Sequence, residues 1–351
     1  MGSGTVMRYY FRADGNASIG AGHLMRCLTI ADALQELPGV EKGDICFLCA
    51  DEASGALAKA GGYGSVVFCT DYRNMEAELP LLTGLLQAEN PVHKPVLIVD
   101  SYYITEAYLK AARQQAFLFL LDDMAKQAYP VDQVLNYNAF ATEEQYRQLY
   151  QEGNVKFYTG SKYVPLRPQF RQTGYTLRET VQNILITTGG GDQENIAASI
   201  FETIEQPGFQ YHVVIGRYHP DFQGWLRRER DSSQLHVHHD VRDMASLMRD
   251  CDIAVTAGGT TIYELAAIGV PFLCFSYAEN QENLTEYIGR RHIACYCGAF
   301  HHNPKATLAE IRRLTHGLIA GPSLRRSMHE NERNMVDGLG AVRIARLLAE
   351  I

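Results

Sequence analysis

The stretch FRADGNASIGAGHLMRCLTIADAL, residues 11–34, combines glycine turns with ionisable side chains. His23 follows Gly20 and Gly22 and precedes an amphipathic segment, so the pattern predicts that it lies in the first turn of a helix. The amino end of a helix disfavours the imidazolium ion, which leaves a neutral ring able to accept a proton. That is the chemistry of a general base. The alternative is a histidine that only packs beneath the loop, and the neighbouring charges weigh against it: Arg12, Asp14 and Arg26.

A second stretch, DIAVTAGGTTIYELAAIGVP, suggests anion binding. Its glycines Gly258 and Gly259 and the hydroxyls of Thr260 and Thr261 precede a helix, and Glu264 follows about one turn later. Backbone amides at a helix amino end suit a diphosphate, and a carboxylate can accept hydrogen bonds from ribose. An ordinary strand, turn and helix with a threonine cap is the alternative.

A further glycine loop, TTGGGD, follows a predicted strand. Its Gly189, Gly190 and Asp192 could hold a phosphate or line a ligand site. The sequence lacks the GxxxxGK[ST] pattern, which excludes a P-loop.

The elements that would position these residues alternate along the chain as short apolar runs and longer helical segments. We predict an α/β, GT-B-like protein of two doubly wound parallel-sheet domains, 7–170 and 171–351, facing each other across a cleft. Residues 164–180 are expected to link them, and the helix 340–351 either closes the second domain or crosses back to the first. The predicted strands are 7–12, 45–49, 66–69, 96–100, 117–122, 134–136, 183–187, 212–216, 235–238, 253–256, 271–276 and 294–296.

The composition of the chain argues against several classes of function. The chain has 351 residues, 46% of them hydrophobic, and a net charge of −8, which argues against general nucleic-acid binding. No run is long and apolar enough for a membrane span, and MGSGTV lacks the features of a secretion signal. The eight cysteines lie mostly in apolar runs without paired CxxC spacing, so we expect reduced thiols in a cytoplasmic protein. The oligomeric state is not indicated.

Cofactor and metal sites are not expected. In a GxGxxG pattern starting at Gly20, the third glycine would fall at Met25, which argues against a nicotinamide site. Three sets of residues could bind a metal but are better explained as loop, strand or surface residues: Asp122 with Asp123, Cys295 with Cys297, and His236 with His238 and His239.

The second half resembles the UDP-binding domain of the two-domain glycosyltransferase superfamily that contains MurG, through HVHHDVRDMASLMRDCDIAVTAGGTTIYELAAIGVPFL. That resemblance implies ribose binding by Glu264 and contact of uracil with backbone near Met244. The stretch FRADGNASIGAGHLMRC is more specific and is similar to the opening signature of the pseudaminic-acid pathway UDP-sugar hydrolases. Further similarity runs through VDSYY, LDD, NYNAFA, TTGGGD, ENQENL and VDGLGAVRIARLL, and so covers nearly the whole chain.

The resemblance implies a hydrolase that releases UDP from UDP-2,4-diacetamido-2,4,6-trideoxy-β-L-altropyranose by water attack at the anomeric carbon, with inversion and without a metal. The implied catalytic residues are His23 as base, with Tyr102 and Asn280 at the reacting end, although Tyr103 beside Tyr102 leaves that assignment open. The expected substrate-binding residues are Arg12, Asp14, Gly20, Gly22, Arg26, Asp100, Asn136, Gly189, Gly190, Asp192, Met244, Gly258, Gly259, Thr260, Thr261, Glu264 and Gln281. A MurG-like glycosyltransferase and a catalytically silent nucleotide-sugar binder are the rival functions.

Overall fold

The computed structural model describes residues 7–16, 18–88, 94–151, 153–171, 174–189, 192, 194–216 and 219–351. Contacts divide the chain into two compact units. The first unit contains Met1–Pro165 together with Leu339–Ile351, and the second contains Leu166–Gly338. The end of the chain therefore belongs to the first unit, where its last helix, α13 (Gly340–Ala349), packs against α1 (Gly22–Gln35).

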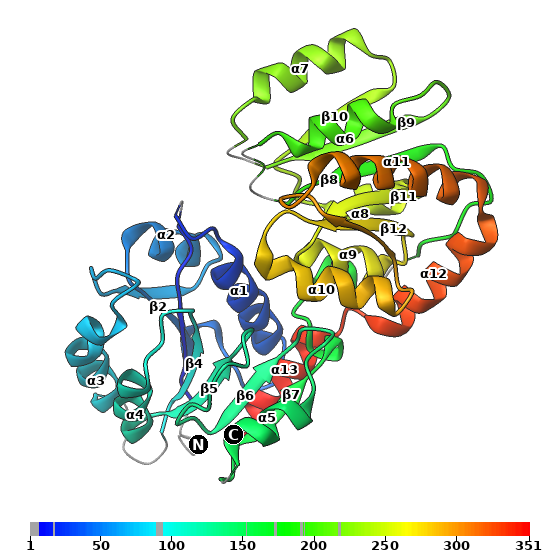
Figure 1. Ribbon diagram of the computed structural model, residues 1–351. Coiled ribbons are helices and arrows are strands. Elements are labelled where there is room, and N and C mark those ends of the chain that lie inside the picture. Colours follow the sequence, from blue (N-terminus) through cyan, green and yellow to red (C-terminus); the bar gives the residue numbers. More distant parts are fainter. Residues whose placement is uncertain are drawn as a thin grey trace. The chain divides into compact units, whose positions relative to one another are not determined.

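The first unit contains a seven-stranded parallel sheet in the order β3-β2-β1-β4-β5-β6-β7 (Figure 1). The strand order reverses between β1 and β4, and the pairing of Ala13 with Asp100 brings the carboxyl ends of these two strands level. Loops after such a switch point are the usual place for a ligand in this fold. The strands are β1 (Tyr9–Ala13), β2 (Ile45–Cys49), β3 (Gly64–Val67), β4 (Val96–Asp100), β5 (Phe117–Leu121), β6 (Gln133–Asn136) and β7 (Lys156–Thr159).

Helices cover both faces of this sheet because alternate strand residues point to opposite sides. On one face Tyr10, Leu97 and Leu118 join a buried cluster with side chains from α3, α4 and α5. On the other face Phe11 stacks on Phe47, on the side where α1 and α2 pack together. The remaining helices of this unit are α2 (Glu52–Ala60), α3 (Leu79–Gln87), α4 (Glu106–Gln115) and α5 (Glu143–Tyr150).

The second unit repeats the layout with a six-stranded parallel sheet in the order β10-β9-β8-β11-β12-β13 (Figure 1). Its switch point lies between β8 and β11. The strands are β8 (Asn183–Thr187), β9 (Gln210–Ile215), β10 (Leu235–His239), β11 (Ile253–Ala257), β12 (Phe272–Ser276) and β13 (Cys295–Ala299). The helices are α6 (Ile196–Ile204), α7 (Phe222–Asp231), α8 (Met244–Asp250), α9 (Thr260–Ile268), α10 (Glu279–Arg290), α11 (Pro304–Ala320) and α12 (Pro322–Met335).

The predicted fold class, two doubly wound parallel-sheet α/β units, is confirmed, and one edge strand was missed. The edge strand β7 was not predicted, because its residues KFYT are partly or fully exposed and carry no run of buried apolar residues. The expected linker, residues 164–180, contains the point where the two units divide, after Pro165, and part of it is packed. Its Phe170 is buried, and its Gln169 bonds to the backbone of residues 242 and 245 in the second unit.

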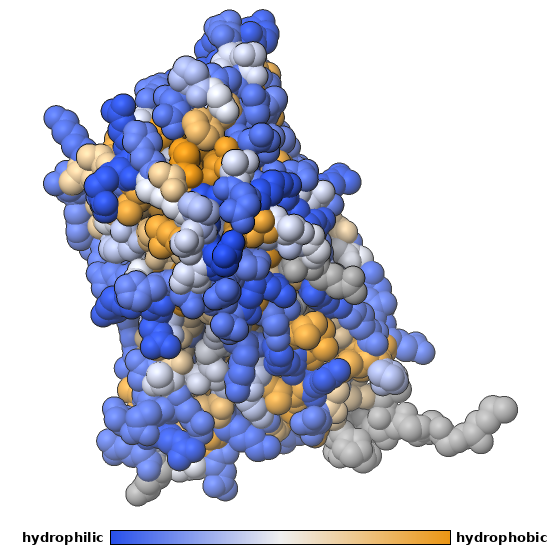
Figure 2. Space-filling model, turned by 90° about the vertical axis from the view of Figure 1, so that its right-hand side faces the viewer, coloured by the Kyte–Doolittle hydropathy of each residue, from blue (hydrophilic) through white to orange (hydrophobic). Residues whose placement is uncertain are grey.

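The described surface offers no membrane-spanning element. No helix among the described residues is both long and apolar enough to cross a bilayer. On the face shown in Figure 2, hydrophilic residues predominate and the apolar residues form small separated groups.

Candidate active site

The loop after β1 brings His23 to the switch point of the first unit. Asn16 and Gly20 form a short antiparallel bridge that narrows the loop, and Gly20 adopts a φ of +74°, which favours glycine. Helix α1 then begins at Gly22, so His23 is its second residue, as predicted. A Cβ on Gly20 or Gly22 would meet nothing within 4 Å, so the backbone is open at both residues.

His23 lies in a small pocket built from the ends of neighbouring strands. Its Nδ1 is 4.0 Å from Oδ1 of Asp100, and its ring meets the ring of Tyr102 edge to face at 4.5 Å. The side chain is 19% exposed, so it is shielded yet reachable. The pocket has a volume of about 180 Å³ and is lined by Asp14, Ile19, His23, Tyr72, Asp100, Ser101, Tyr102 and Tyr103.

Arg26 holds the carboxylate that faces His23. Its guanidinium binds both oxygens of Asp100, with 2.5 Å from Nε to Oδ2, and its Nη1 lies 2.7 Å from Oδ2 of Asp123. Tyr137 accepts a further hydrogen bond from the same nitrogen. The attraction of Asp100 and Asp123 outweighs desolvation and raises the pKa of Arg26. Because this planar fork fixes Asp100, it also fixes the acceptor next to His23.

Tyr102 and Tyr103 both line the pocket, but they have different neighbours. The Tyr102 hydroxyl donates to Oδ2 of Asp123 at 3.2 Å, whereas Tyr103 stacks edge to face on Tyr72. Desolvation and the nearby Asp123 carboxylate raise the pKa of Tyr102, so its hydroxyl stays protonated at neutral pH. Tyr102 is thus the tyrosine that contacts the His23 ring.

Two of the expected substrate-binding residues are buried beneath the site. Arg12 is 0% exposed and its guanidinium binds Glu78 at 2.6 and 2.8 Å and Asp14 at 2.6 Å. Asn136 is also buried, with its side-chain amide bonded to Tyr146 and to the backbone of residue 138. Direct ligand contact does not fit either side chain, because their polar atoms already have partners inside the fold. Arg12 instead orients Asp14, which reaches the pocket.

The glycine turn after β11 forms the corresponding position in the second unit. A Cβ on Gly258 would lie 2.7 Å from Cβ of Gln281, so only glycine allows this close packing against α10. Gly259 has a φ of +149° with open space around it, and α9 begins at Thr260 without a side-chain cap from any described residue. Its first backbone amides are therefore available to an anion. Thr261 follows within the same turn.

The glycine loop after β8 is described only in part. Gly189 has a φ of +82° and open space around it, whereas Gly190 lies outside the described residues. The carboxylate of Asp192 accepts hydrogen bonds from the amides of Ile196 and Ala197 at 2.7 and 2.9 Å. Asp192 is buried and secures the start of α6, a structural role that does not fit direct ligand contact.

The expected nucleoside residues of the second unit lie near α8 and α9. Glu264 binds Nη2 of Arg167 at 3.1 Å, and burial nevertheless raises the pKa of its carboxyl. Met244 is the first residue of α8 and is buried. The side chain of Gln169 donates to the backbone oxygen of Arg242 and accepts from the amide of Ala245.

The two expected residues on α10 differ in exposure. Asn280 is exposed in the first turn, whereas Gln281 packs against Gly258 and accepts a hydrogen bond from the amide of Tyr277 at 3.0 Å. Asn280 can reach a ligand without disturbing any described hydrogen bond of its side chain, and Gln281 shapes the glycine turn.

Several site residues were not predicted. Tyr72 enters the first pocket from the loop after β3, and Glu78 is the buried partner of Arg12. Arg167 and Gln169 belong to the segment expected to be a linker. None of these positions carries a local motif. Asp122 and Asp123 do not act as a pair: Asp122 binds Tyr146, and Asp123 binds Arg26.

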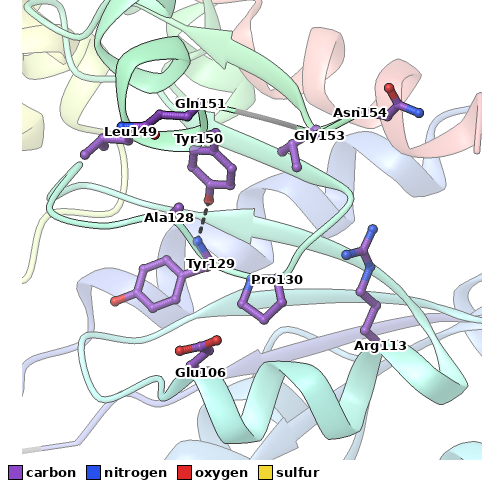
Figure 3. A pocket seen from close by; sticks show the side chains of 11 residues that line it. Glu106, Arg113, Ala128, Tyr129, Pro130, Leu149, Tyr150, Gln151, Gly153 and Asn154 are labelled. Carbon is purple, nitrogen blue, oxygen red and sulfur yellow. Dashed lines mark hydrogen bonds between the residues drawn. The ribbon is translucent and has the colours of Figure 1, made fainter.

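A larger pocket of about 520 Å³ lies elsewhere on the first unit, between α4, the loop 128–130 and the end of α5 (Figure 3). Tyr150 accepts a hydrogen bond from the backbone amide of Tyr129 across it, and Glu106 and Arg113 stand on the α4 side. None of the expected site residues lines this pocket, so size alone does not identify the site here.

Comparison with curated proteins gives relatives in sugar biosynthesis, although no family model matches the chain. The spore coat polysaccharide biosynthesis protein SpsG of Bacillus subtilis is 30% identical over 210 residues, 58% of this chain and 61% of that protein. The chain thus spans less than two thirds of the length of this relative. A UDP-2,4-diacetamido-2,4,6-trideoxy-β-L-altropyranose hydrolase of Campylobacter jejuni is 22% identical over 291 residues, 81% of this chain and 97% of that protein.

Comparison with solved structures supports the fold. MurG of Acinetobacter baumannii matches with a TM-score of 0.70 at 12% identity, over 98% of this chain and 100% of that one. Identity at this level shows the fold alone. The chain therefore has the α/β fold of GT-B glycosyltransferases, and its predicted similarity to the UDP-sugar hydrolases of the pseudaminic-acid pathway is confirmed.

Proposed function

We propose that this protein is a hydrolase that cleaves UDP-2,4-diacetamido-2,4,6-trideoxy-β-L-altropyranose into UDP and the free sugar. The observation that carries the proposal is the pocket at the first switch point, where the His23 ring lies between Asp100 and Tyr102. A nucleotide-binding protein without catalysis needs no oriented imidazole, whereas water activation does.

His23 acts as the general base. Asp100 faces Nδ1 and favours the tautomer that carries its proton there, which leaves Nε2 to accept a proton from water. The present distance of 4.0 Å exceeds a hydrogen bond, and such contacts often shorten when substrate binds. The water oxygen bonds to the anomeric carbon as the bond from that carbon to the UDP oxygen breaks. The proton passes to Nε2, and the configuration inverts because attack and departure occur on opposite sides.

UDP leaves as an anion and requires stabilisation more than protonation. The glycine turn at Gly258 and Gly259 and the amino end of α9 supply backbone donors for the diphosphate. Glu264 holds the ribose, and backbone near Met244 contacts uracil. In this proposal Asn280 contacts the reacting end of the substrate.

The proposed reaction requires no metal or other cofactor, because the base and the anion site are both built from protein groups. Turnover is therefore expected to survive treatment with a chelator. The proposal also places the enzyme in the cytoplasm, where its free cysteines remain reduced.

A glycosyltransferase is the second candidate, since the fold of this chain is shared with MurG. It would use the same donor site and the same base, but His23 would take a proton from an acceptor hydroxyl instead of water. The two candidates differ in whether an acceptor is required.

The deciding experiment incubates the full chain with the UDP-diacetamido sugar in ¹⁸O-water without any acceptor. The hydrolase releases UDP and free sugar in equal amounts, and UDP carries no ¹⁸O because the bond at carbon breaks. UDP-N-acetylglucosamine serves as the matched control nucleotide sugar and should react much more slowly. Release of UDP only after an acceptor is added would favour the transferase.

A further inference from the structure

A cluster of metal-ligating side chains lies in the second unit, outside every residue used in the proposed reaction. Glu282 is in the first turn of α10, and His301 and His302 are in the turn between β13 and α11. One ligand atom from each of the three side chains lies within 4.8 Å of the others. Among the described residues, this is the one group of three or more such side chains that meets this spacing.

The distances within the cluster suit a shared cation. Oε1 of Glu282 is 2.9 Å from Nε2 of His301 and 3.5 Å from Nε2 of His302. Ligand atoms bound at about 2.0–2.1 Å to a tetrahedral ion lie about 3.3 Å from one another. Small side-chain movements would therefore complete the geometry. The two rings already lie side by side, with centroids 4.1 Å apart.

The carboxylate oxygen of the cluster provides a second, independent observation. Oε1 of Glu282 is shielded from solvent and accepts no hydrogen bond from the described residues, although a ring nitrogen lies so close. Facing neutral imidazoles, this oxygen has no well-placed donor, whereas protonated imidazoles would form ion pairs with it. A bound cation would be shared by this oxygen and the two imidazoles in place of those ion pairs.

We propose that Glu282, His301 and His302 bind one divalent transition-metal ion, with zinc as the best fit. Imidazole and carboxylate are ordinary zinc ligands, and two histidines with one glutamate leave a fourth position for water. His302 is the most exposed of the three, which gives the ion a path from solvent. The ion joins the first turn of α10 to the turn after β13 and so stabilises the second unit.

The proposed ion does not serve the diphosphate. Gln281 faces Gly258 at the turn after β11, whereas its neighbour Glu282 faces the turn after β13. Strand β12 lies between β11 and β13 in the sheet, so Gln281 and Glu282 of α10 contact loops at different strands. Zinc binding should therefore change stability and leave the release of UDP intact.

The test titrates zinc into the full chain after removal of metals with a chelator. We expect one site that binds zinc at micromolar concentration or tighter and a thermal midpoint that rises when zinc is added. Glu282→Gln and His301→Ala should each weaken zinc binding by at least about tenfold and abolish the rise. Glu282→Gln retains the shape of the side chain, so circular dichroism and the midpoint without zinc should match the parent.

Matched controls separate this site from incidental binding by other histidines and by cysteines. His316→Ala removes an exposed histidine of α11. His238→Gln removes a histidine of strand β10, which pairs with β9. Both should bind zinc as the parent does. The proposal is overturned if the parent binds no zinc, if Glu282→Gln binds it unchanged, or if His238→Gln loses it. A thiolate charge-transfer band in the cobalt-substituted protein would also overturn it, because the ion would then be on cysteine.

Discussion

The two switch points differ in the groups that they present to a ligand. At the first, after β1 and β4, charged side chains dominate, and two arginine forks bind four carboxylates: Glu78, Asp14, Asp100 and Asp123. At the second, after β8 and β11, glycines with positive φ and the start of a helix present backbone amides. The same strand arrangement around the switch point thus supports a site of oriented side chains in one unit and a site of backbone donors in the other.

This difference indicates how each site can fail. Side chains must be held at fixed positions, so the first site depends on the partners that surround His23. Backbone donors are fixed by the fold itself, so the second site depends on small residues that allow the chain to turn. Substitutions that act on one site and not on the other therefore test whether the comparison is sound.

The largest expected effect follows His23→Ala. Loss of a single general base should lower kcat by about 10²–10⁴-fold, while UDP affinity should stay within a few-fold of the parent because the proposed nucleotide site lies in the second unit. Steady-state release of UDP and a UDP titration measure the two quantities. His316→Ala on α11 is the control histidine. Turnover of His23→Ala near that of the parent would exclude His23 as the base.

The two arginine forks offer a matched pair of substitutions. Lysine keeps the charge but loses the planar fork. Arg26→Lys should lower kcat by up to about 10²-fold with little change in stability, because Asp100 is no longer fixed beside His23. Arg12→Lys should instead mainly lower the free energy of unfolding, by about 1–3 kcal/mol, because the side chain is fully buried and loses its paired bonds to Glu78, which does not line the pocket.

The measurements for this pair are kcat, KM and a urea unfolding curve for each variant. A pH profile of kcat adds a readout that a purely structural role for Arg26 would not change. If both variants lose stability and activity in the same proportion, the distinction between Arg26, which holds a carboxylate of the pocket, and the buried Arg12 is wrong.

The second site should respond to Gly259→Ala. At a φ of +149° an alanine is strained, so the turn is expected to shift and UDP to bind about tenfold more weakly. Gly317→Ala on α11 is the control, since a Cβ there meets nothing within 4 Å and helix propensity favours alanine by about 1 kcal/mol. Calorimetry with UDP separates them. Equal UDP affinity in both variants would mean that this turn does not bind the nucleotide.

The sequence predicts the backbone of both sites better than their side-chain partners. Strands of continuous apolar residues and glycine turns are local patterns, which is why β1, β4, β8 and β11 and the helix start at His23 could be predicted. The partners of Arg26 come from positions 74, 97 and 111 residues away, and no local pattern reports such pairings. The burial of Arg12 and Asn136 could not be predicted for the same reason. An arginine or asparagine at a strand end can bind either a ligand or another side chain, and the sequence does not show which.

A smaller effect concerns stability at acidic pH in the second unit. His212 lies against His238 at 3.0 Å and stacks on His236, and desolvation with these neighbours lowers its pKa to about 4. The unfolded chain takes up a proton near pH 6.5 that the folded chain does not, so stability falls as pH drops from about 6.5 to 4. Asp250 opposes the shift, and Glu229 opposes the similar lowering at His238.

His212→Asn should therefore reduce the loss of stability between pH 7 and pH 5 by on the order of 1 kcal/mol. Urea unfolding of the full chain at the two pH values gives the difference. His316→Ala again serves as the comparison, because it removes a histidine that lies outside the stacked cluster. A slope for His212→Asn identical to that of the parent would show that the stacked histidines are not the source.

The smallest expected effect is found at a buried carboxylate that, unlike those of the first site, has no cationic partner among its described contacts. Glu332 on α12 is 0% exposed, its oxygens accept no well-formed hydrogen bond from the described residues, and burial raises its pKa well above the usual range. The folded chain keeps a proton that the unfolded chain releases, so this group stabilises the protein at acidic pH and its contribution is lost as pH rises.

Glu332→Gln keeps the volume without the charge and should raise stability at pH 8 by about 1 kcal/mol or less, with no gain at pH 4. Unfolding curves at the two pH values measure this, and a loss of stability at pH 8 would mean that the Glu332 carboxylate has a partner that holds it ionised, as the carboxylates beside Arg12 and Arg26 have.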